Sequence, residues 1–277
     1  MSSAITRYIH DHEPQTGSFN MTADDVLARG LSSSGCNSIL RIYSFNPPAV
    51  SLGRNQSESE VNMLACQLKE WDVIRRSTGG RSLLHLNDIC YSIIVPINFN
   101  VFKDLRRLYE GIALSLASAL VKLGIKASPI DIPIKPPFNK QIKNARLCIS
   151  ARVRGEVHVK GRKITAASQR IYRDSILQHG SIFYGGDPSI VADIVPSKLF
   201  DGNDFVAKLK ERVITIEEAQ PHPIPAKLFI NVFISQLCHH FSFNLDDKPL
   251  TSNELEEIAA LESNFALLSF EHEYSAG

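Results

Sequence analysis

The chain has 277 residues, 44% of them hydrophobic, and a formal net charge of +1. This composition is ordinary for a globular protein and can fill a sizeable core. No apolar run approaches the ~20 residues that a membrane-spanning helix needs, so we expect no membrane protein. The five cysteines are odd in number and include no C-x-x-C pair, which argues against a disulfide framework or a zinc site. The amino terminus is polar and lacks a signal-like apolar segment, so we expect a reduced, cytoplasmic setting.

The hydrophobic pattern predicts helices and strands along the first half of the chain. In order, these are a helix (22–28), a strand (39–45), a strand after the Pro47-Pro48 turn (49–52) and a helix (59–71). Two strands then surround a paired-glycine turn and end at Pro96. Five leucine and isoleucine residues follow at helical spacing: Leu108, Ile112, Leu116, Leu120 and Leu123. Gly124 is a natural stop for that helix.

The second half begins with a proline- and lysine-rich stretch, 129–146, whose lack of periodicity predicts a long loop that leads directly to Cys148. Strands are predicted over 147–184, ending at Gly185-Gly186. The remainder is predicted to be helical, over 188–194, 204–212 and 226–241. A final helix begins at a capping box formed by Thr251 and Glu254.

Strands in the middle and helices at both ends predict an α+β fold, with a mixed, mostly antiparallel sheet flanked by helices. We expect one main domain over residues 1–244. Residues 245–277 would form a short helical appendage of the same domain.

Charge is unevenly distributed. From Lys135 to Arg173 eleven Lys and Arg residues face one acid, Glu156, which gives +10, and from Thr251 to Gly277 six glutamates give −6. A basic face around a reaction centre suits an acidic protein partner, whereas solvated strands and loops are the plainer interpretation. We expect no nucleic-acid partner, because no helix-turn-helix, zinc or stacking pattern is present.

Cys148 and Lys163 form the first candidate site. Cys148 lies on a short apolar segment, and Lys163 follows on the next predicted strand. A tight reversal near Gly155 between antiparallel strands would bring both side chains to one end of a sheet. A thiolate beside an ammonium is an activated nucleophile for acyl transfer. When the pair is considered alone, an inert core cysteine is the better explanation of the thiol.

The second candidate segment runs from Arg75 to His85 and contains the turn Gly79-Gly80. Paired glycines permit positive φ and let the backbone approach a bound molecule closely. His85 would lie just past the turn and face the same cavity. An ordinary hairpin turn with solvated arginines is the alternative.

Together these segments resemble the biotin/lipoate A/B protein ligase family, and within it the LipM-type octanoyltransferases. The resemblance covers nearly the whole chain and rests on several motifs jointly. They are Gly17–Met21 with Asp24-Asp25, Pro47–Gln56, Arg75–Arg81, Gly161–Ile164 with Ser168-Gln169, and Ile176–Ile182. The Gly-Gly-Arg turn, Cys148 and Glu156 are more similar to the transferases than to the ATP-using ligases. Ala166 and Ala167 replace the family's usual glycine and serine, and Leu86 replaces an aspartate.

The resemblance implies the catalytic fold shared with biotin protein ligase and class II synthetase-like domains. It also implies transfer of an octanoyl group from acyl carrier protein to a lysine of an apo lipoyl domain. That acceptor would belong to a 2-oxoacid dehydrogenase or to the glycine cleavage H protein. Because a thioester is already activated, we expect no cofactor, nucleotide or metal.

Residue roles follow from the same resemblance. Cys148 would hold the acyl group as a thioester, and Lys163 would stabilise the thiolate and orient the carbonyl. Backbone amides between Lys163 and Ala166 would form an oxyanion hole. The expected substrate-binding residues are Arg76, Gly79, Gly80, His85, Ala166 and His179.

Three alternatives remain open from the sequence. The first is an ATP-dependent lipoate–protein ligase in which Cys148 is incidental. The second is an amidotransferase that moves octanoate between lipoyl domains. The third, from a different class, is a non-catalytic lipoyl-domain binder.

The remaining histidines and Cys90 are weaker candidates. His179 could line the cleft or make a structural hydrogen bond. The alternation of the strand places His158 at the surface, and Cys90 in the core. His239 and His240 diverge by ~100° on a helix and cannot share a metal ion well, so they are expected to form an exposed helix end.

Overall fold

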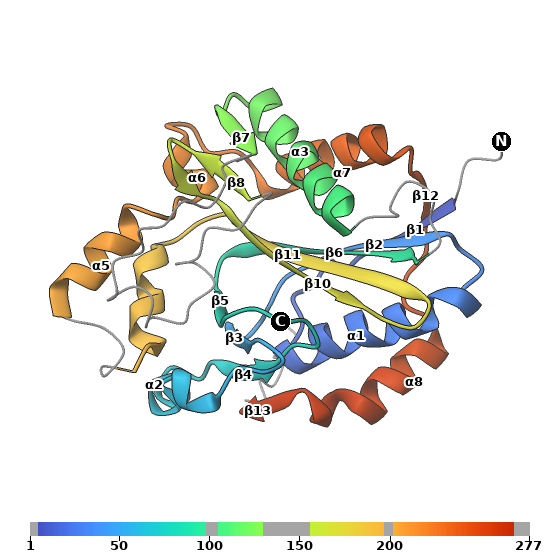
Figure 1. Cartoon of the computed structure of the whole chain (residues 1–277), viewed down its shortest axis with the longest axis horizontal. Coiled ribbons are helices and arrows are strands. Elements are labelled where there is room, and N and C mark those ends of the chain that lie inside the picture. Colours follow the sequence, from blue (N-terminus) through green and yellow to red (C-terminus); the bar gives the residue numbers. More distant parts are fainter. Residues whose placement is uncertain (1–4, 98–104, 130–155, 197–201, 269–277) are drawn as a thin grey trace, which may run out of the picture.

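The computed structural model describes residues 5–97, 105–129, 156–196 and 202–268. Within these ranges, strands β1 to β13 form three sheets, and helices flank them (Figure 1). The expected α+β class, with helices on the outside of a mixed sheet, is therefore confirmed.

The large sheet carries most of the core. Its strand order is β10 (Thr165–Ile171), β11 (Ser175–Phe183), β6 (Asp88–Pro96), β2 (Ser38–Tyr43), β1 (Ile5–His10) and β12 (Asn244–Asp247). Pairing is antiparallel from β10 through β2, while β1 is parallel to both β2 and β12. The long central strands β6 and β11 are almost entirely buried, because helices cover both faces of the sheet.

Two smaller sheets complete the architecture. One has the order β13 (Ala266–Leu268), β4 (Asp72–Arg75), β3 (Ala49–Leu52) and β5 (Leu83–His85). The other consists of β7 (Ala127–Pro129), β8 (Val157–Val159) and β9 (Arg162–Lys163). The paired-glycine turn lies between β4 and β5 of the four-stranded sheet. A hydrogen bond from Ser168 on β10 to the carbonyl of Gly79 joins this turn to the large sheet.

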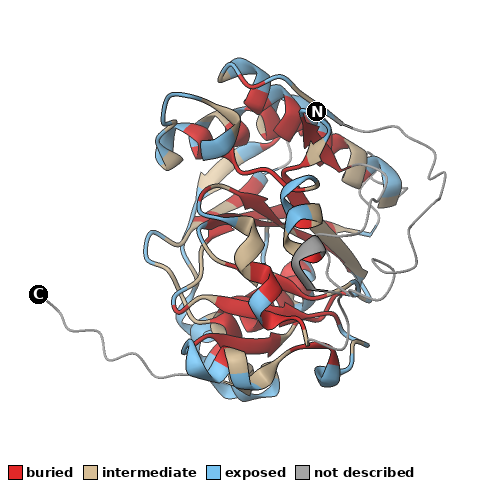
Figure 2. Cartoon of the chain, turned by 90° about the vertical axis from the view of Figure 1, so that its left-hand side faces the viewer, coloured by how far each residue is buried: buried red, intermediate tan, exposed pale blue. Residues whose placement is uncertain are grey.

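Two layers of helices bury the large sheet. Helices α3 (Leu105–Lys122) and α7 (Ala226–Phe241) pack together on one face, and α1 (Gly17–Gly30) with α8 (Ser252–Leu261) covers the other (Figure 1). Figure 2 shows the buried residues concentrated in the strands and on the inward faces of the helices. Apolar burial of this kind is the main favourable term in folding.

The helices with the clearest periodicity are confirmed. Leu108, Ile112, Leu116 and Leu120 are all buried on the inner face of α3, and Gly124 follows with a φ of +86°. Helix α8 begins at the expected capping box, in which Thr251 accepts from the amide of Glu254 and the Glu254 carboxylate accepts from the amide of Thr251.

The predicted helix over 59–71 is wrong in its extent. A 3-10 turn (Glu58–Glu60) ends at Val61, which is extended, and α2 (Met63–Leu68) then begins at an asparagine cap, Asn62. Glu70 adopts a φ of +54°, which a continuing helix does not allow. The cap at Asn62 therefore divides a stretch that the apolar periodicity predicts as one helix into a 3-10 turn and a short α-helix.

The strand region after residue 147 differs in one respect from the prediction. The expected reversal near Gly155 and the segment that carries Cys148 lie outside the described residues. The described reversal joins β8 to β9 at Lys160 and Gly161, whose φ angles are +50° and +76°. A short hairpin, which the sequence pattern did not indicate, therefore presents Lys163.

The segment after residue 244 contributes to both layers. Strand β12 adds to the edge of the large sheet beside β1, and α8 packs on α1. An ion pair between Arg7 and Glu254, with 2.7 Å between Nη1 and Oε1, joins the two ends of this arrangement. The division at residue 244 stays a prediction.

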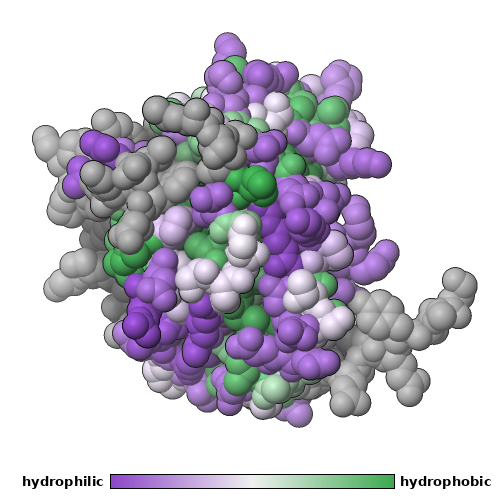
Figure 3. All heavy atoms as spheres, turned by 90° about the vertical axis from the view of Figure 1, so that its right-hand side faces the viewer, coloured by the Kyte–Doolittle hydropathy of each residue, from purple (hydrophilic) through white to green (hydrophobic). Residues whose placement is uncertain are grey.

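None of the helices in the described ranges is both long and apolar enough to cross a bilayer. Among the coloured residues of Figure 3, which shows the face seen from the right of Figure 1, hydrophilic residues predominate and hydrophobic residues form small separate groups.

Candidate active site

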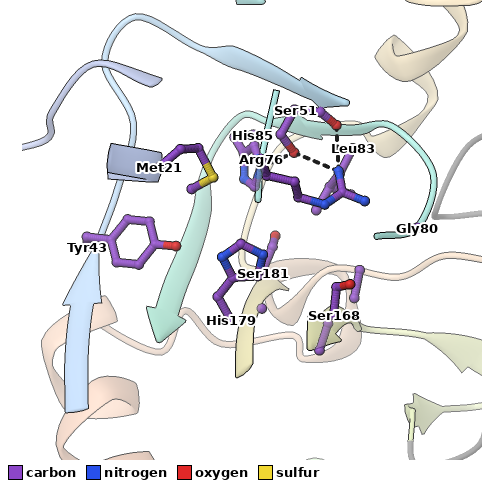
Figure 4. Close-up of a pocket in the computed structure, with 13 residues that line it drawn as sticks. Met21, Tyr43, Ser51, Arg76, Gly80, Leu83, His85, Ser168, His179 and Ser181 are labelled. Carbon is purple, nitrogen blue, oxygen red and sulfur yellow. Dashed lines mark hydrogen bonds between the residues drawn. The ribbon is translucent and has the colours of Figure 1, made fainter. Parts of the chain in front are cut away.

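A pocket lies between the large sheet and the sheet that carries the glycine turn. Its empty volume, which includes space open to solvent, is about 420 Å³. The lining residues are Met21, Tyr43, Ser51, Arg76, Gly80, Leu83, His85, Ala166, Ala167, Ser168, His179, Gly180 and Ser181. Figure 4 shows Met21 and Tyr43 at one end, Gly80 and Ser168 at the other, and polar side chains on the walls between them.

Arg76 fixes the glycine turn from inside. Its guanidinium is buried, and Nη1 donates to the Ser51 carbonyl at 2.7 Å, while Nη2 donates to the carbonyls of Gly79 at 2.9 Å and Arg81 at 2.7 Å. Arg76 therefore lines the pocket as expected, and it also holds the turn in shape with charge-assisted hydrogen bonds.

The two glycines of the turn have different roles. Gly80 lines the pocket with a φ of +99°, a conformation that other residues rarely adopt. Gly79 is not among the lining residues, and its carbonyl accepts hydrogen bonds from Arg76 and, at 2.9 Å, from the hydroxyl of Ser168. That last bond ties the turn to β10 on the opposite side of the pocket.

His85 is the centre of one buried hydrogen-bond chain. Its Nδ1 lies 2.8 Å from Asp88 Oδ2, and its Nε2 lies 2.9 Å from the Ser51 hydroxyl. The ring stacks on Phe45 with 4.1 Å between centroids. Burial alone would raise the pKa of Asp88, but His85 and hydrogen bonds from Ser181 and Cys90 leave that pKa below its ordinary value. Asp88 is therefore a carboxylate beside the imidazole.

His179 is the centre of a second chain, and both interpretations of this residue are correct. It lines the pocket, and its Nδ1 lies 2.9 Å from Asp24 Oδ2 while its Nε2 lies 2.7 Å from the Thr78 hydroxyl. Burial alone would raise the pKa of Asp24, yet the hydrogen bond from His179 and the charge of Arg41 leave it lowered. The hydroxyl of Tyr43 lies 3.1 Å from the same carboxylate.

The remaining wall is made of small or apolar residues. Ala166 is buried in the pocket wall, and Gly180 has no room for a side chain because a Cβ there would lie 2.6 Å from the Tyr91 hydroxyl. Together with Met21 and Leu83, these residues leave a hollow suited to an alkyl chain.

Lys163 lies on β9 and is not among the residues that line the pocket. Its side chain is buried, with Nζ 2.6 Å from Glu156 Oε1. The amides of Lys163 and Ile164 donate to the carbonyls of Arg212 and Val157. These two amides are therefore already engaged, which contradicts the expected oxyanion hole at this end of the segment.

His158 is the one histidine whose predicted position is wrong. It is buried, not at the surface, and its Nε2 lies 3.6 Å from the second carboxylate oxygen of Glu156. All three residues of β8 are buried, so the strand alternation that predicted an exposed side chain does not apply. His239 and His240 lie in the last turn of α7 and are exposed, as expected.

Burial keeps most of the described thiols protonated. Cys90 is in the core, as expected, and burial together with Asp88 raises its pKa well above the ordinary value. Burial also raises the pKa of Cys66 to about 11 and raises that of Cys238. His85, Asp88 and Cys90 lie close enough together to offer three metal donors, but their hydrogen bonds to one another account for the cluster.

Comparisons with known proteins identify the family of the chain. The family model of the lipoyl protein ligase A/B catalytic domain matches residues 16–238. The chain belongs to this family. The octanoyltransferase LipM of Staphylococcus epidermidis is 29% identical over 89% of this chain and 91% of its own length. LipM of Halalkalibacterium halodurans is 28% identical over 90% of both chains.

Solved structures show the same fold. A bi-partite lipoate protein ligase from Thermoplasma acidophilum, solved as part of a lipoylation system with its E2 lipoyl domain, has a TM-score of 0.74 at 17% identity and covers 95% of this chain and 93% of its own. A lipoate-protein ligase A bound with ATP has a TM-score of 0.72 at 17% identity, with 94% of each chain covered. The biotin/lipoate ligase fold expected for this member of the lipoyl ligase family is confirmed.

The residues that sequence reasoning missed are the partners of the two histidines. Ser51 and Asp24 occur in the motifs that support the family resemblance, but neither was assigned a role. Nothing in the linear pattern pairs residue 24 with residue 179, since their contact depends on how α1 lies against β11.

Proposed function

We propose that this protein transfers an octanoyl group from acyl carrier protein to a lysine of an apo lipoyl domain, through a thioester on Cys148. The observation that carries the proposal is the apolar pocket, walled by Met21, Leu83 and Ala166, in a chain that resembles octanoyltransferases along most of its length. The acceptor would be the lipoyl domain of a 2-oxoacid dehydrogenase or the glycine cleavage H protein.

The chemistry proceeds in two acyl transfers. The Cys148 thiolate attacks the thioester carbon, a new carbon–sulfur bond forms and the carrier's thiol leaves. The lysine amine of the lipoyl domain then attacks the Cys148 thioester, the amide forms and the cysteine is released. Each step replaces one bond to the acyl carbon by another, so neither step consumes a nucleotide.

Two features support this assignment of roles. The raised pKa values of Cys66, Cys90 and Cys238 make these thiols poor nucleophiles at neutral pH, which leaves Cys148 with less competition. The buried ammonium of Lys163 is a charge that can stabilise a thiolate or a developing oxyanion near it.

Intact-mass measurement after incubation with octanoyl-acyl carrier protein tests the proposal. We expect one octanoyl group that peptide mapping places on Cys148, and Cys90→Ala and Cys238→Ala should retain it. A Cys148 peptide that stays unmodified would contradict the nucleophile.

Nucleotide dependence distinguishes the transferase from the ligase alternative. Octanoyl transfer from the carrier to a lipoyl domain should proceed without ATP or magnesium. If free lipoate with ATP proves the sole productive donor, the protein is a ligase and the proposed function is wrong.

A further inference from the structure

The pocket wall contains a second set of reactive groups, which the chemistry of Cys148 does not use. Asp88, His85 and Ser51 form a continuous hydrogen-bond chain, with 2.8 Å from Asp88 Oδ2 to His85 Nδ1 and 2.9 Å from His85 Nε2 to Ser51 Oγ. The stacked ring of Phe45 and the hydroxyl of Ser181, 2.5 Å from Asp88 Oδ2, hold the imidazole and the carboxylate in place. The order carboxylate, imidazole, hydroxyl is that of a serine hydrolase triad.

The hydrogens along this chain can be assigned from chemistry. An ionised carboxylate only accepts, so the hydrogen between Asp88 and His85 belongs to Nδ1. In the neutral imidazole, Nε2 then carries a lone pair that faces Ser51, and the serine hydroxyl donates to it. His85 is thus placed to take the proton of Ser51.

Arg76 adds a positive charge beside the same hydroxyl. Its Nη1 lies 3.3 Å from Ser51 Oγ, and Figure 4 shows both side chains on the same wall of the pocket. A fixed guanidinium next to an oxygen that loses its proton favours the charge that develops there. Ser51 therefore has a base on one side and a cation on the other.

A second hydrogen-bond chain beside the pocket can be compared with the first. Asp24, His179 and Thr78 form a similar chain, with 2.9 and 2.7 Å between successive partners. Ser51 is among the residues that line the cavity, whereas Thr78 is not. Of these two hydroxyls, a bound acyl group can reach that of Ser51.

We propose that Ser51 is a second nucleophile of this pocket, which accepts an acyl group from a bound acyl thioester and releases it to water, with His85 as the base and Asp88 as the residue that orients it. The inference rests on the proposed function for the class of acyl substrate. It adds a thioesterase activity that does not require Cys148.

Each step balances. Ser51 Oγ bonds to the acyl carbon while its proton passes to His85 Nε2, the carbon–sulfur bond breaks, and His85 protonates the departing thiolate. Water then loses a proton to His85 and bonds to the acyl carbon, the carbon–Oγ bond breaks, and His85 returns the proton to Ser51. The sum converts thioester and water to carboxylic acid and thiol without a redox change.

The test is thiol release from octanoyl-N-acetylcysteamine by the Cys148→Ala protein, in the presence of a chelator. We expect release to continue in Cys148→Ala and to fall about 100-fold or more when Ser51→Ala or Asp88→Asn is added. An octyl fluorophosphonate should label Ser51 and leave Thr78 unmodified, as peptide mapping by mass spectrometry will show. Thr78→Val is the matched control and should keep the label on Ser51.

A further variant keeps the test valid if serine removal disturbs the fold. Cys148→Ala/Ser51→Cys restores a nucleophile at the same position, and intact mass should show one octanoyl adduct at residue 51. Unchanged thiol release in Ser51→Ala, or a label on another residue, would overturn the proposal, and loss of release with the chelator alone would assign the activity to a bound metal. None of these outcomes depends on Cys148, so an octanoyl group mapped to Cys148 in the unmutated protein reports separately on the proposed function.

Discussion

The ammonium of Lys163 lies 2.6 Å from the carboxylate of Glu156, and each residue is only 2% exposed. A buried ammonium beside a carboxylate exerts a weaker field on a third group than an isolated ammonium does. Glu156 therefore limits how strongly Lys163 can stabilise a thiolate, and it also sets the direction in which the side chain points.

The first prediction follows from this pair. Lys163→Met keeps the apolar stem and removes the positive charge, so the pKa of the Cys148 thiol should rise and its acylation should slow. Glu156→Gln removes the opposing negative charge, so the same pKa should fall. Iodoacetamide alkylation of Cys148 across pH measures both variants. If the two pH profiles coincide with that of the unmutated protein, Lys163 does not activate the thiol.

The second prediction concerns the adjacent glycines of the turn. Gly80→Ala should lower the free energy of unfolding by about 1–3 kcal/mol, because φ is +99° and the new Cβ would lie 2.8 Å from Arg76 Nη2. Gly79→Ala is the matched control and should change stability by less than about 0.5 kcal/mol, since nothing lies within 4 Å of its Cβ position. Urea unfolding measures both. Equal losses would show that the conformation of Gly80 does not constrain the turn.

The third prediction concerns acid stability. The pKa values of Asp24 and Asp88 are lowered in the folded protein, so the unfolded chain binds protons at a pH where the folded protein does not. Their contribution to stability is complete above the ordinary value of 3.8 and is lost as the pH falls below it. Asp88→Asn should therefore flatten the loss of stability below about pH 4. Unfolding by urea at pH 3 to 6 measures this, and an unchanged slope would contradict the prediction.

The fourth prediction concerns docking of the carrier. The chain from Lys135 to Arg173 has a charge of +10, and we expect an acidic partner to be attracted to it. Lys140→Glu with Lys143→Glu should raise the KM for acyl carrier protein and weaken its dependence on salt, because screening acts over ~8–10 Å at physiological ionic strength. Steady-state kinetics at low and high salt measure both effects. Unchanged kinetics at low salt would exclude a role in steering.

The sequence predicts the features that depend on residues close together in the chain, but not those that depend on residues far apart in it. Helix α3 and the capping box of α8 follow from spacing within a few residues, and both are found in the structure. The helix predicted over 59–71 is too long because Asn62, which caps α2, leaves the spacing of the apolar residues around it unchanged. The position of His158 differs from the prediction because alternation predicts which face a side chain lies on, but does not predict whether that face is covered.

The candidate site shows the same limit. Arg76, Gly80, His85, Ala166 and His179 are expected at the cavity and line it, because each lies within or close to a recognisable motif. The two aspartate–histidine–hydroxyl chains were not expected, because each joins residues from separate elements. Asp24, for example, is 155 positions from His179.

The pairing of β1 with β12 has a consequence for how the protein is made. Arg7 on β1 and Glu254 on α8 form their ion pair across 247 positions of the chain, and β12 covers the backbone edge of β1. A ribosome adds about 5–20 residues each second, so the edge of β1 stays uncovered for roughly 12–50 s after its synthesis. An uncovered strand edge can pair with another chain, so during this interval the nascent protein can associate with other chains through β1.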